Sequence, residues 1–140
     1  MSLPACILLV DDDQTTNYLN RLLLKRLAIA DELLVAQNGL EALEVLRTHR
    51  PQSESGAPVL VFLDVKMPVM DGFEFLQAYE QLPAADKAQT VIVMLTTSLH
   101  PHDVERMQQL NIGGFLNKPL TKEKVDAVLQ RHFPQPVSAD

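Results

Sequence analysis

The fold is decided by one stretch, Val59-Leu60-Val61-Phe62-Leu63-Asp64, in which an unbroken apolar run ends in a carboxylate. Such a short run is typical of a strand buried on both faces of a parallel sheet. Two further runs are built in the same way: residues 6–10 lead into Asp11-Asp12-Asp13, and residues 113–117 lead into Lys118-Pro119. Because open α/β sheets place their ligand sites at the carboxyl ends of the strands, we expect these charged side chains to meet at one edge of a sheet.

The chain alternates short apolar segments with segments of helical periodicity. The expected strands are residues 6–10, 33–36, 59–63, 91–95 and 115–116. The helices between and after them are marked by apolar residues at helical spacing: Tyr18, Leu19, Leu22, Leu23 and Leu27; Leu40, Leu43 and Leu46; Phe73, Leu76 and Tyr79; Val104, Met107 and Leu110; Val125, Val128, Leu129 and His132. The candidate helix caps are Asp13, Asn38, Asp71 and Thr121. Five strands alternating with five helices predict an α/β fold, a parallel sheet with helices on both faces.

Length and composition fit a single domain. A chain of 140 residues, of which 46% are hydrophobic, can bury a sizeable core. We expect one domain over residues 1–133 and a short polar tail at residues 134–140. No apolar stretch approaches the ~20 residues of a membrane span, and the N-terminus lacks the pattern of a signal peptide, so we expect a cytoplasmic protein without a membrane anchor.

Charge and residue usage narrow the function classes. The net charge of −6 argues against direct binding to nucleic acid, so proteins are the expected partners. The single cysteine, Cys6, excludes an internal disulfide and is expected to be a small buried residue. His100 and His102 flank a proline, and we expect them to be solvated rather than to bind a metal. Residues 47–58 are expected to form an exposed surface loop.

The aspartates gathered at one edge raise an electrostatic problem. Two carboxylates 4 Å apart repel each other by roughly 4 kcal/mol at an effective dielectric near 20. Lys118 supplies only one positive charge in return. A buried carboxyl can take up a proton, or the group can hold a hard cation such as Mg²⁺. A divalent metal beside one phosphate-accepting carboxylate is the simplest interpretation; alternatively, the aspartates after the first run only cap a helix, although a cap requires one of them.

Four motifs occur in order at the ends of successive expected strands. They are an apolar run followed by Asp11-Asp12; Phe62-Leu63-Asp64-Val65-Lys66-Met67-Pro68-Val69-Met70-Asp71-Gly72; Val93-Met94-Leu95-Thr96; and Gly114-Phe115-Leu116-Asn117-Lys118-Pro119. Together they resemble the receiver domain of bacterial two-component response regulators, here in a stand-alone form, from Ile7 to about Phe133. The resemblance implies a flavodoxin-like, doubly wound sheet of five parallel strands in the order 2-1-3-4-5, of which receivers are a standard example.

The resemblance also implies a role for each charged residue at the edge. Asp64 is the expected phosphoacceptor, taking a phosphoryl group from a phosphohistidine on a sensor kinase or on a histidine phosphotransfer protein. Asp12 and Asp64 are expected to bind Mg²⁺ directly, with the backbone carbonyl of Lys66 as a third ligand and Asp11 acting through a coordinated water. Lys118 and the metal neutralise charge on the phosphoryl oxygens. The peptide bond between Lys118 and Pro119 is expected to be cis.

Further residues resemble the switching and tuning positions of the family. Thr96 and Phe115 resemble the switch pair, in which a hydroxyl turns toward the phosphoryl group and an aromatic ring follows it. The resemblance also implies that Thr96 takes part in the phosphoryl chemistry. Lys66 and Ser98 occupy positions that tune the lifetime of the acyl phosphate. Such a protein is a signalling receiver rather than an enzyme, although it assists its own phosphorylation and dephosphorylation. The expected output is a change in binding to a downstream target, or to a second copy, through the face formed by residues 104–129.

Three alternatives remain open from the sequence. The receiver can be a carrier in a multistep relay rather than a switch. A phosphatase of the haloacid-dehalogenase type would use Asp11 as nucleophile in Asp11-Asp12-Asp13-Gln14-Thr15, but it needs a late acidic pair and leaves Asp64 unexplained. A flavin-binding electron carrier shares the fold, but the three aspartates would repel a flavin phosphate. Fold alone does not decide among these functions.

Overall fold

The structure is a computed structural model that describes residues 4–48, 58–65, 70–83, 87, 90–97, 101–110 and 112–133. Its strands are β1 (Cys6–Val10), β2 (Glu32–Ala36), β3 (Val59–Asp64), β4 (Thr90–Thr96) and β5 (Gly114–Asn117). Its helices are α1 (Gln14–Leu27), α2 (Gly39–Thr48), α3 (Gly72–Glu80), α5 (Pro101–Gln108) and α6 (Lys122–His132). Each strand and helix expected from the sequence is present among them.

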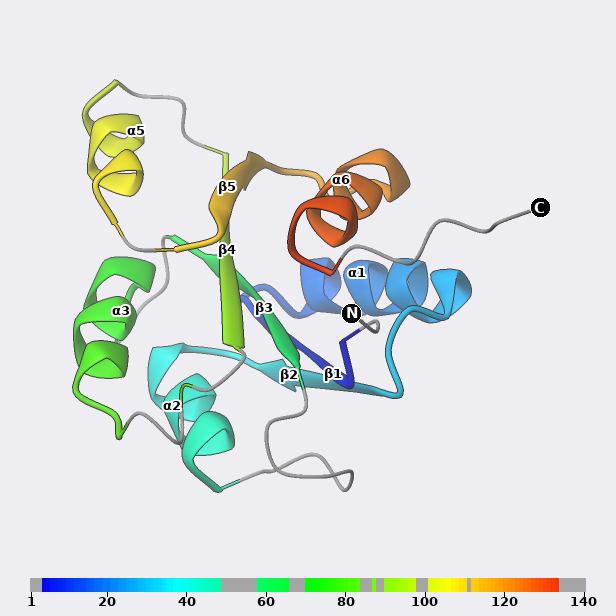
Figure 1. Cartoon of the computed structure of the whole chain (residues 1–140), viewed down its shortest axis with the longest axis horizontal. Coiled ribbons are helices and arrows are strands. Elements are labelled where there is room, and N and C mark those ends of the chain that lie inside the picture. The colour runs from blue at the N-terminus through cyan, green and yellow to red at the C-terminus, as the bar shows by residue number, and fades with distance from the viewer. Residues whose placement is uncertain are drawn as a thin grey trace.

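The strands form one parallel sheet in the order β2-β1-β3-β4-β5. Helices α1 and α6 cover one face of the sheet, and α2, α3 and α5 cover the other (Figure 1). The predicted doubly wound fold and strand order are therefore confirmed. Within the described part of the chain, none of the helices is long and apolar enough to cross a membrane.

Alternating residues of the central strands fill two separate cores. Leu8 and Val61 face the side covered by α2, α3 and α5, where Phe75 is fully buried. Ile7 and Phe62 face the opposite side, where they pack with residues of α1 and α6. Both faces of β1 are thus covered, which explains why its sequence is apolar without alternation. Cys6 is buried as expected, and burial raises the pKa of its thiol to about 12.

Side-chain caps fix where four of the described helices begin. At the start of α2, Oδ1 of Asn38 accepts a hydrogen bond from the backbone N–H of Glu41 at 2.9 Å. Asp13 accepts a hydrogen bond from the backbone N–H of Thr15 at the start of α1, and Thr121 accepts one from Lys124 at the start of α6. Asp71 forms a full capping box with Glu74 at the start of α3. Helix α1 begins shortly after β1, and α6 begins shortly after β5. Their caps therefore hold in place the loops that carry Asp11, Asp12 and Lys118.

The residues whose spacing predicted α1 do not all face the core. Tyr18, Leu19 and Leu22 are 61%, 57% and 42% exposed, whereas Asn17 and Asn20 on the same helix are buried. The polar residues thus lie inside and several large apolar residues lie outside. Leu40 on α2, another residue used to predict a helix, is likewise exposed. Helical periodicity located these helices correctly but did not identify which side chains contact the core.

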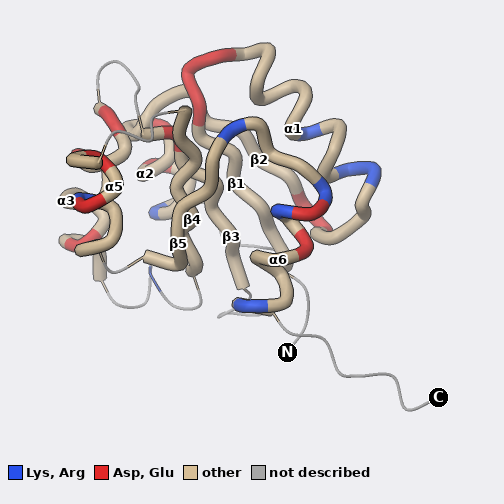
Figure 2. Tube along the Cα trace, turned by 90° about the horizontal axis from the view of Figure 1, so that it is seen from above, with Lys and Arg blue, Asp and Glu red and all other residues tan. Residues whose placement is uncertain are grey.

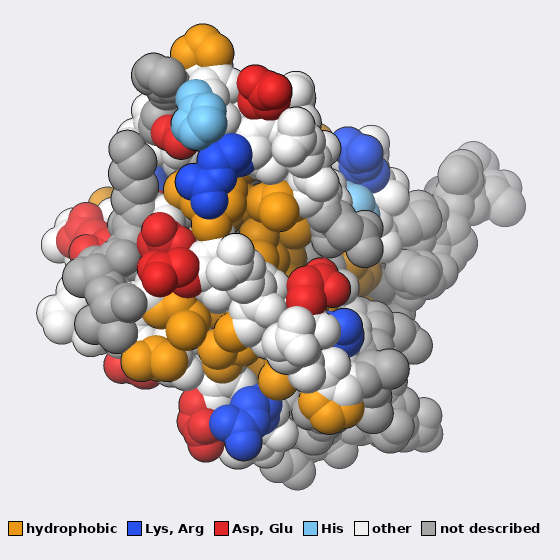
Figure 3. All heavy atoms as spheres, turned by 90° about the vertical axis from the view of Figure 1, so that its left-hand side faces the viewer, with side chains coloured by type: hydrophobic (Ala, Val, Ile, Leu, Met, Phe, Trp, Pro, Cys, Tyr) orange, Lys and Arg blue, Asp and Glu red, His pale blue; other side chains and the backbone are white. Residues whose placement is uncertain are grey.

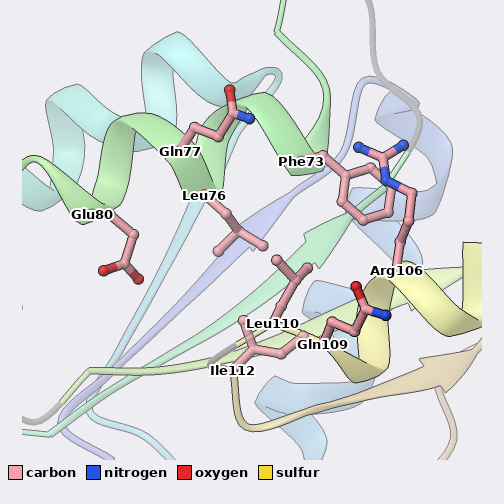
Figure 4. Close-up of a pocket in the computed structure, with 8 residues that line it drawn as sticks. All are labelled: Phe73, Leu76, Gln77, Glu80, Arg106, Gln109, Leu110 and Ile112. Atoms are coloured by element: carbon pink, nitrogen blue, oxygen red, sulfur yellow. The ribbon is translucent and has the colours of Figure 1, made fainter.

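Helices α3 and α5 are separated by a groove on the surface, whereas α2 packs closely against α3. The groove has a volume of about 310 Å³ and an apolar floor that includes Leu76, Leu110 and Ile112 (Figures 3 and 4). At one end the guanidinium of Arg106 lies over the ring of Phe73, with its carbon 3.7 Å from the ring centre (Figure 4). This cation–π contact connects α5 to α3.

Candidate functional site

The carboxylates of Asp11, Asp12 and Asp64 lie together at the carboxyl edge of the sheet. The register pairs Val10 of β1 with Leu63 of β3, so the next residue on each strand is an aspartate. Oxygen atoms of the three carboxylates lie within 4.8 Å of one another. Asp11 and Asp64 are 3% and 6% exposed, whereas Asp12 is open to solvent. The expected convergence is therefore present, with two buried carboxylates and one accessible one.

Lys118 extends into this cluster from the end of β5. Its Nζ lies 2.7 Å from Oδ2 of Asp11 and 3.1 Å from Oδ1 of Asp64. Burial alone would lower the pKa of Lys118, but its hydrogen bonds and charge interactions with Asp11 and Asp64 outweigh burial and raise it. The ammonium therefore remains charged at neutral pH. The peptide bond that follows, to Pro119, is cis as expected.

The carboxylate of Asp64 is destabilised by its surroundings. Burial is the main cause that raises the pKa of its carboxyl, and the neighbouring charge of Asp11 adds to it. The hydrogen bond and positive charge of Lys118 oppose both effects without cancelling them. A carboxylate that is buried, close to other negative charge and only partly compensated favours the binding of a further cation.

Asp11 is held by several hydrogen bonds, but Asp12 is not. Oδ1 of Asp11 accepts from the backbone N–H of Asp13 at 2.9 Å, and Oδ2 accepts from Lys118. The backbone carbonyl of Asp11 accepts from Nδ2 of Asn17 at 2.7 Å. Among the described residues, the carboxylate of Asp12 has no hydrogen bond. Asp12 is therefore the member of the cluster that is free to coordinate an ion from solvent.

The start of α3 packs against the backbone of Asp64 and Val65. The N–H of Gly72 donates to the carbonyl of Val65 at 2.8 Å. A Cβ atom at Gly72 would lie 2.8 Å from the backbone oxygen of Asp64 and 3.0 Å from Cα of Val65. Only glycine fits here without displacing the backbone that carries Asp64. The sequence identified Asp71-Gly72 as the start of a helix, but not this close approach.

The two expected switch residues lie on neighbouring strands near the cluster. Thr96 is buried at the end of β4, and Phe115 is half-buried on β5 opposite Met94. The backbone N–H of Lys118 donates to the carbonyl of Thr96 at 2.9 Å, so the lysine and the threonine share one local backbone contact. The structure thus places Thr96 beside the strand end that presents Lys118.

Some predicted residues fall outside the described part of the chain. These are the tuning positions Lys66 and Ser98, His100, residues 49–57 of the long loop and the tail 134–140. His102 is described and is exposed at the start of α5. Asn17 was missed by sequence reasoning, although a polar residue at a position where a helix faces the core is a usable signal.

Comparison with known proteins gives one consistent result. A family model of the response regulator receiver domain matches residues 7–130. Response regulator Rcp1 of Synechocystis is 34% identical over 115 residues, which cover 82% of this chain and 77% of that protein. Chemotaxis protein CheY of Halobacterium salinarum is 31% identical over 124 residues, covering 87% and 92% of the two chains. The solved structure of chemotaxis response regulator CheY4 of Vibrio cholerae has a TM-score of 0.73 and 31% identity, and the match covers 93% of this chain and 99% of that one.

The chain therefore belongs to the response regulator receiver domain family of two-component signalling. This confirms the resemblance found in the sequence and assigns a signalling role. It gives no support to a haloacid-dehalogenase-type phosphatase or a flavin carrier.

Proposed function

We propose that Asp64 accepts a phosphoryl group from a phosphohistidine on a sensor kinase or on a histidine phosphotransfer protein. The observation that supports this is the meeting of Asp11, Asp12 and Asp64 with Lys118 at the carboxyl edge of the sheet. Asp64 lies at the end of the central strand β3, and burial is the main cause that raises the pKa of its carboxyl. It is the best-placed nucleophile of the three.

In the transfer, a carboxylate oxygen of Asp64 forms a new bond to phosphorus while the bond from phosphorus to the histidine nitrogen breaks. The electron pair of the broken bond stays on the imidazole nitrogen, and Asp64 becomes an acyl phosphate. Lys118 stabilises the negative charge on the phosphoryl oxygens as the group moves. Its Nζ already lies 3.1 Å from Asp64, so little reorganisation is required.

The donor set of the cluster fits Mg²⁺. This ion prefers one or two carboxylates and keeps several waters. The three carboxylates here supply hard oxygen ligands, and that of Asp12 is exposed to solvent. Asp12 and Asp64 would hold the ion directly, Asp11 would act through a water, and the carbonyl of Lys66 is the proposed third protein ligand. When bound, the ion supplies positive charge that stabilises the transferring phosphoryl group.

The proposed kinase-facing surface is the outer side of α1. This helix begins directly after Asp13 and exposes Tyr18, Leu19 and Leu22. The same helix carries the exposed basic residues Arg21, Lys25 and Arg26 (Figure 2). A partner that delivers a phosphohistidine to Asp64 has to contact the surface around the cluster, and exposed apolar residues are the usual anchors of such contacts.

The proposed output is a change in the surface formed by residues 104–129, which lies on α5, β5 and α6. Thr96 and Phe115 connect it to the cluster, because Phe115 lies on β5 itself and Thr96 contacts the backbone of Lys118. A rearrangement at Asp64 would change which packing of these elements is favoured, and a partner or second copy that prefers one packing would respond. A carrier in a relay would need no such change.

Phosphorylation by acetyl phosphate with Mg²⁺ tests the proposed acceptor. Wild type is expected to gain one acid-labile phosphoryl group in intact-mass measurements, and Asp64→Asn to gain none. The matched control is Asp126→Asn, which removes a carboxylate from α6 and should be phosphorylated like wild type. Persistent labelling of Asp64→Asn would refute the assignment, and labelling lost only in an Asp11 variant would favour the phosphatase alternative.

A further inference from the structure

Asn17 contacts the backbone that leads into the acidic cluster. Its side chain is 4% exposed on the inner side of α1, and its Nδ2 donates to the backbone carbonyl of Asp11 at 2.7 Å. The bond reaches from the helix back to the residue that follows β1. It therefore holds the turn between β1 and α1 in place.

The orientation of this carbonyl bears directly on Asp12. The carbonyl of Asp11 and the N–H of Asp12 belong to the same planar peptide unit, so a bond that holds one orients the other. Asp12 has no side-chain hydrogen bond among the described residues to hold it otherwise. Asp11, in contrast, is additionally anchored through its carboxylate by Asp13 and Lys118. The direction in which Asp12 projects therefore depends on its backbone.

Packing does not explain why this position holds an asparagine. The other polar atom of the side chain, Oδ1, is buried and has no hydrogen-bond partner in the described part of the chain. An unpaired buried acceptor carries a desolvation cost that a leucine of similar size would avoid. The contribution of this residue must then lie in its other end, where Nδ2 meets Asp11.

We propose that Asn17 is a positioning residue for the cation site, which aims Asp12 by fixing the peptide between Asp11 and Asp12. This rests on the proposed function, in which Asp12 is a direct ligand of Mg²⁺. Groups that orient metal ligands commonly change metal affinity by about 10- to 100-fold when they are removed. Because Asn17 donates to the backbone carbonyl of Asp11 and not to a carboxylate of the cluster, its replacement should alter how much Mg²⁺ is needed and leave the transfer step intact.

The test compares Asn17→Leu with Asn20→Leu. Asn20 is also buried on the inner side of α1 but has no hydrogen bond to Asp11 or Asp12 among those described. Calorimetric titration with Mg²⁺ is expected to give a dissociation constant about tenfold higher for Asn17→Leu and within about twofold of wild type for Asn20→Leu. The rate of phosphorylation by acetyl phosphate should follow: Asn17→Leu needs more Mg²⁺ for half-maximal rate but reaches the wild-type maximum at saturation.

The outcomes separate the positioning role from a structural one. If Asn17→Leu binds Mg²⁺ as wild type does, or if its maximal rate falls while its Mg²⁺ requirement is unchanged, the proposal is wrong. If that variant does not fold, Asn17→Ala replaces it, since a smaller residue removes the same donor without crowding. If wild type itself neither binds Mg²⁺ nor is phosphorylated, it is the proposed function that fails.

Discussion

Removing Asp12 should stabilise the protein in the absence of metal. Its carboxylate lies within 4.8 Å of two others, and one ammonium, that of Lys118, compensates part of their charge. About one net negative charge therefore opposes Asp12. At 4.8 Å this repulsion is about 3.5 kcal/mol at an effective dielectric of about 20 and about 0.9 kcal/mol in water. Because Asp12 is exposed, the lower value applies. We therefore expect Asp12→Ala to raise the free energy of unfolding of the metal-free protein by about 1 kcal/mol.

Thermal unfolding in a chelating buffer measures this gain. For a chain of this size, 1 kcal/mol corresponds to a rise in Tm of about 2–5 °C. The gain should shrink as salt is added, since exposed charges are screened. Mg²⁺ at 100 times its dissociation constant should stabilise wild type by about 2.7 kcal/mol and leave Asp12→Ala nearly unchanged. The variant should also lose most of its phosphorylation by acetyl phosphate.

The neighbouring residue provides the control. Asp13→Ala also removes one negative charge, but Asp13 caps α1, so its loss should lower the free energy of unfolding. The two variants should therefore shift Tm in opposite directions. If Asp12→Ala is destabilised in the same way as Asp13→Ala, then Asp12 has a structural role and the electrostatic reasoning is refuted.

Three more predictions follow from the site and its surroundings. Because the pKa of Asp64 is raised in the folded state, ionisation of Asp64 lowers the stability of the metal-free protein as pH rises above about 3.8. Metal-free Asp64→Asn should therefore have a higher Tm than wild type at pH 7, and the difference should disappear toward acid pH. A difference that does not depend on pH would contradict the raised pKa as its cause. Leu22→Ser should slow phosphoryl transfer from a phosphorylated kinase but not from acetyl phosphate. If the variant reacts with the kinase as fast as wild type does, α1 is not the docking surface. Backbone amide shifts on adding beryllofluoride should extend over residues 104–129; shifts confined to the cluster would identify a phosphoryl carrier, and a switch should change partner affinity by about 5- to 150-fold.

The fold and the main site could be predicted because local sequence and global arrangement agree. The strand ends at Val10 and Leu63 are read from apolar runs, and parallel topology alone then brings Asp11 and Asp64 together. Helix caps such as Asp71 were visible because capping chemistry uses few residue types.

Other features depend on three-dimensional contacts that a single sequence does not encode locally. Periodicity on α1 could not show that Leu19 and Leu22 face solvent, because apolar residues at helical spacing indicate a helix without showing which of them are buried. The bond from Asn17 to Asp11 requires the return of α1 along β1, and the approach of Gly72 to Asp64 requires the position of α3 on the sheet. Both are consequences of packing.

The central claim is that Asp64 is the residue that receives the phosphoryl group. The most direct measurement is to phosphorylate the wild-type protein with Mg²⁺ and acetyl phosphate, reduce the acyl phosphate with borohydride and sequence the peptides by mass spectrometry. Reduction converts a phosphorylated aspartate to homoserine and leaves other aspartates unchanged. Homoserine at position 64 and at no other aspartate is the predicted result; homoserine at position 11 or 12, with Asp64 unmodified, would contradict it.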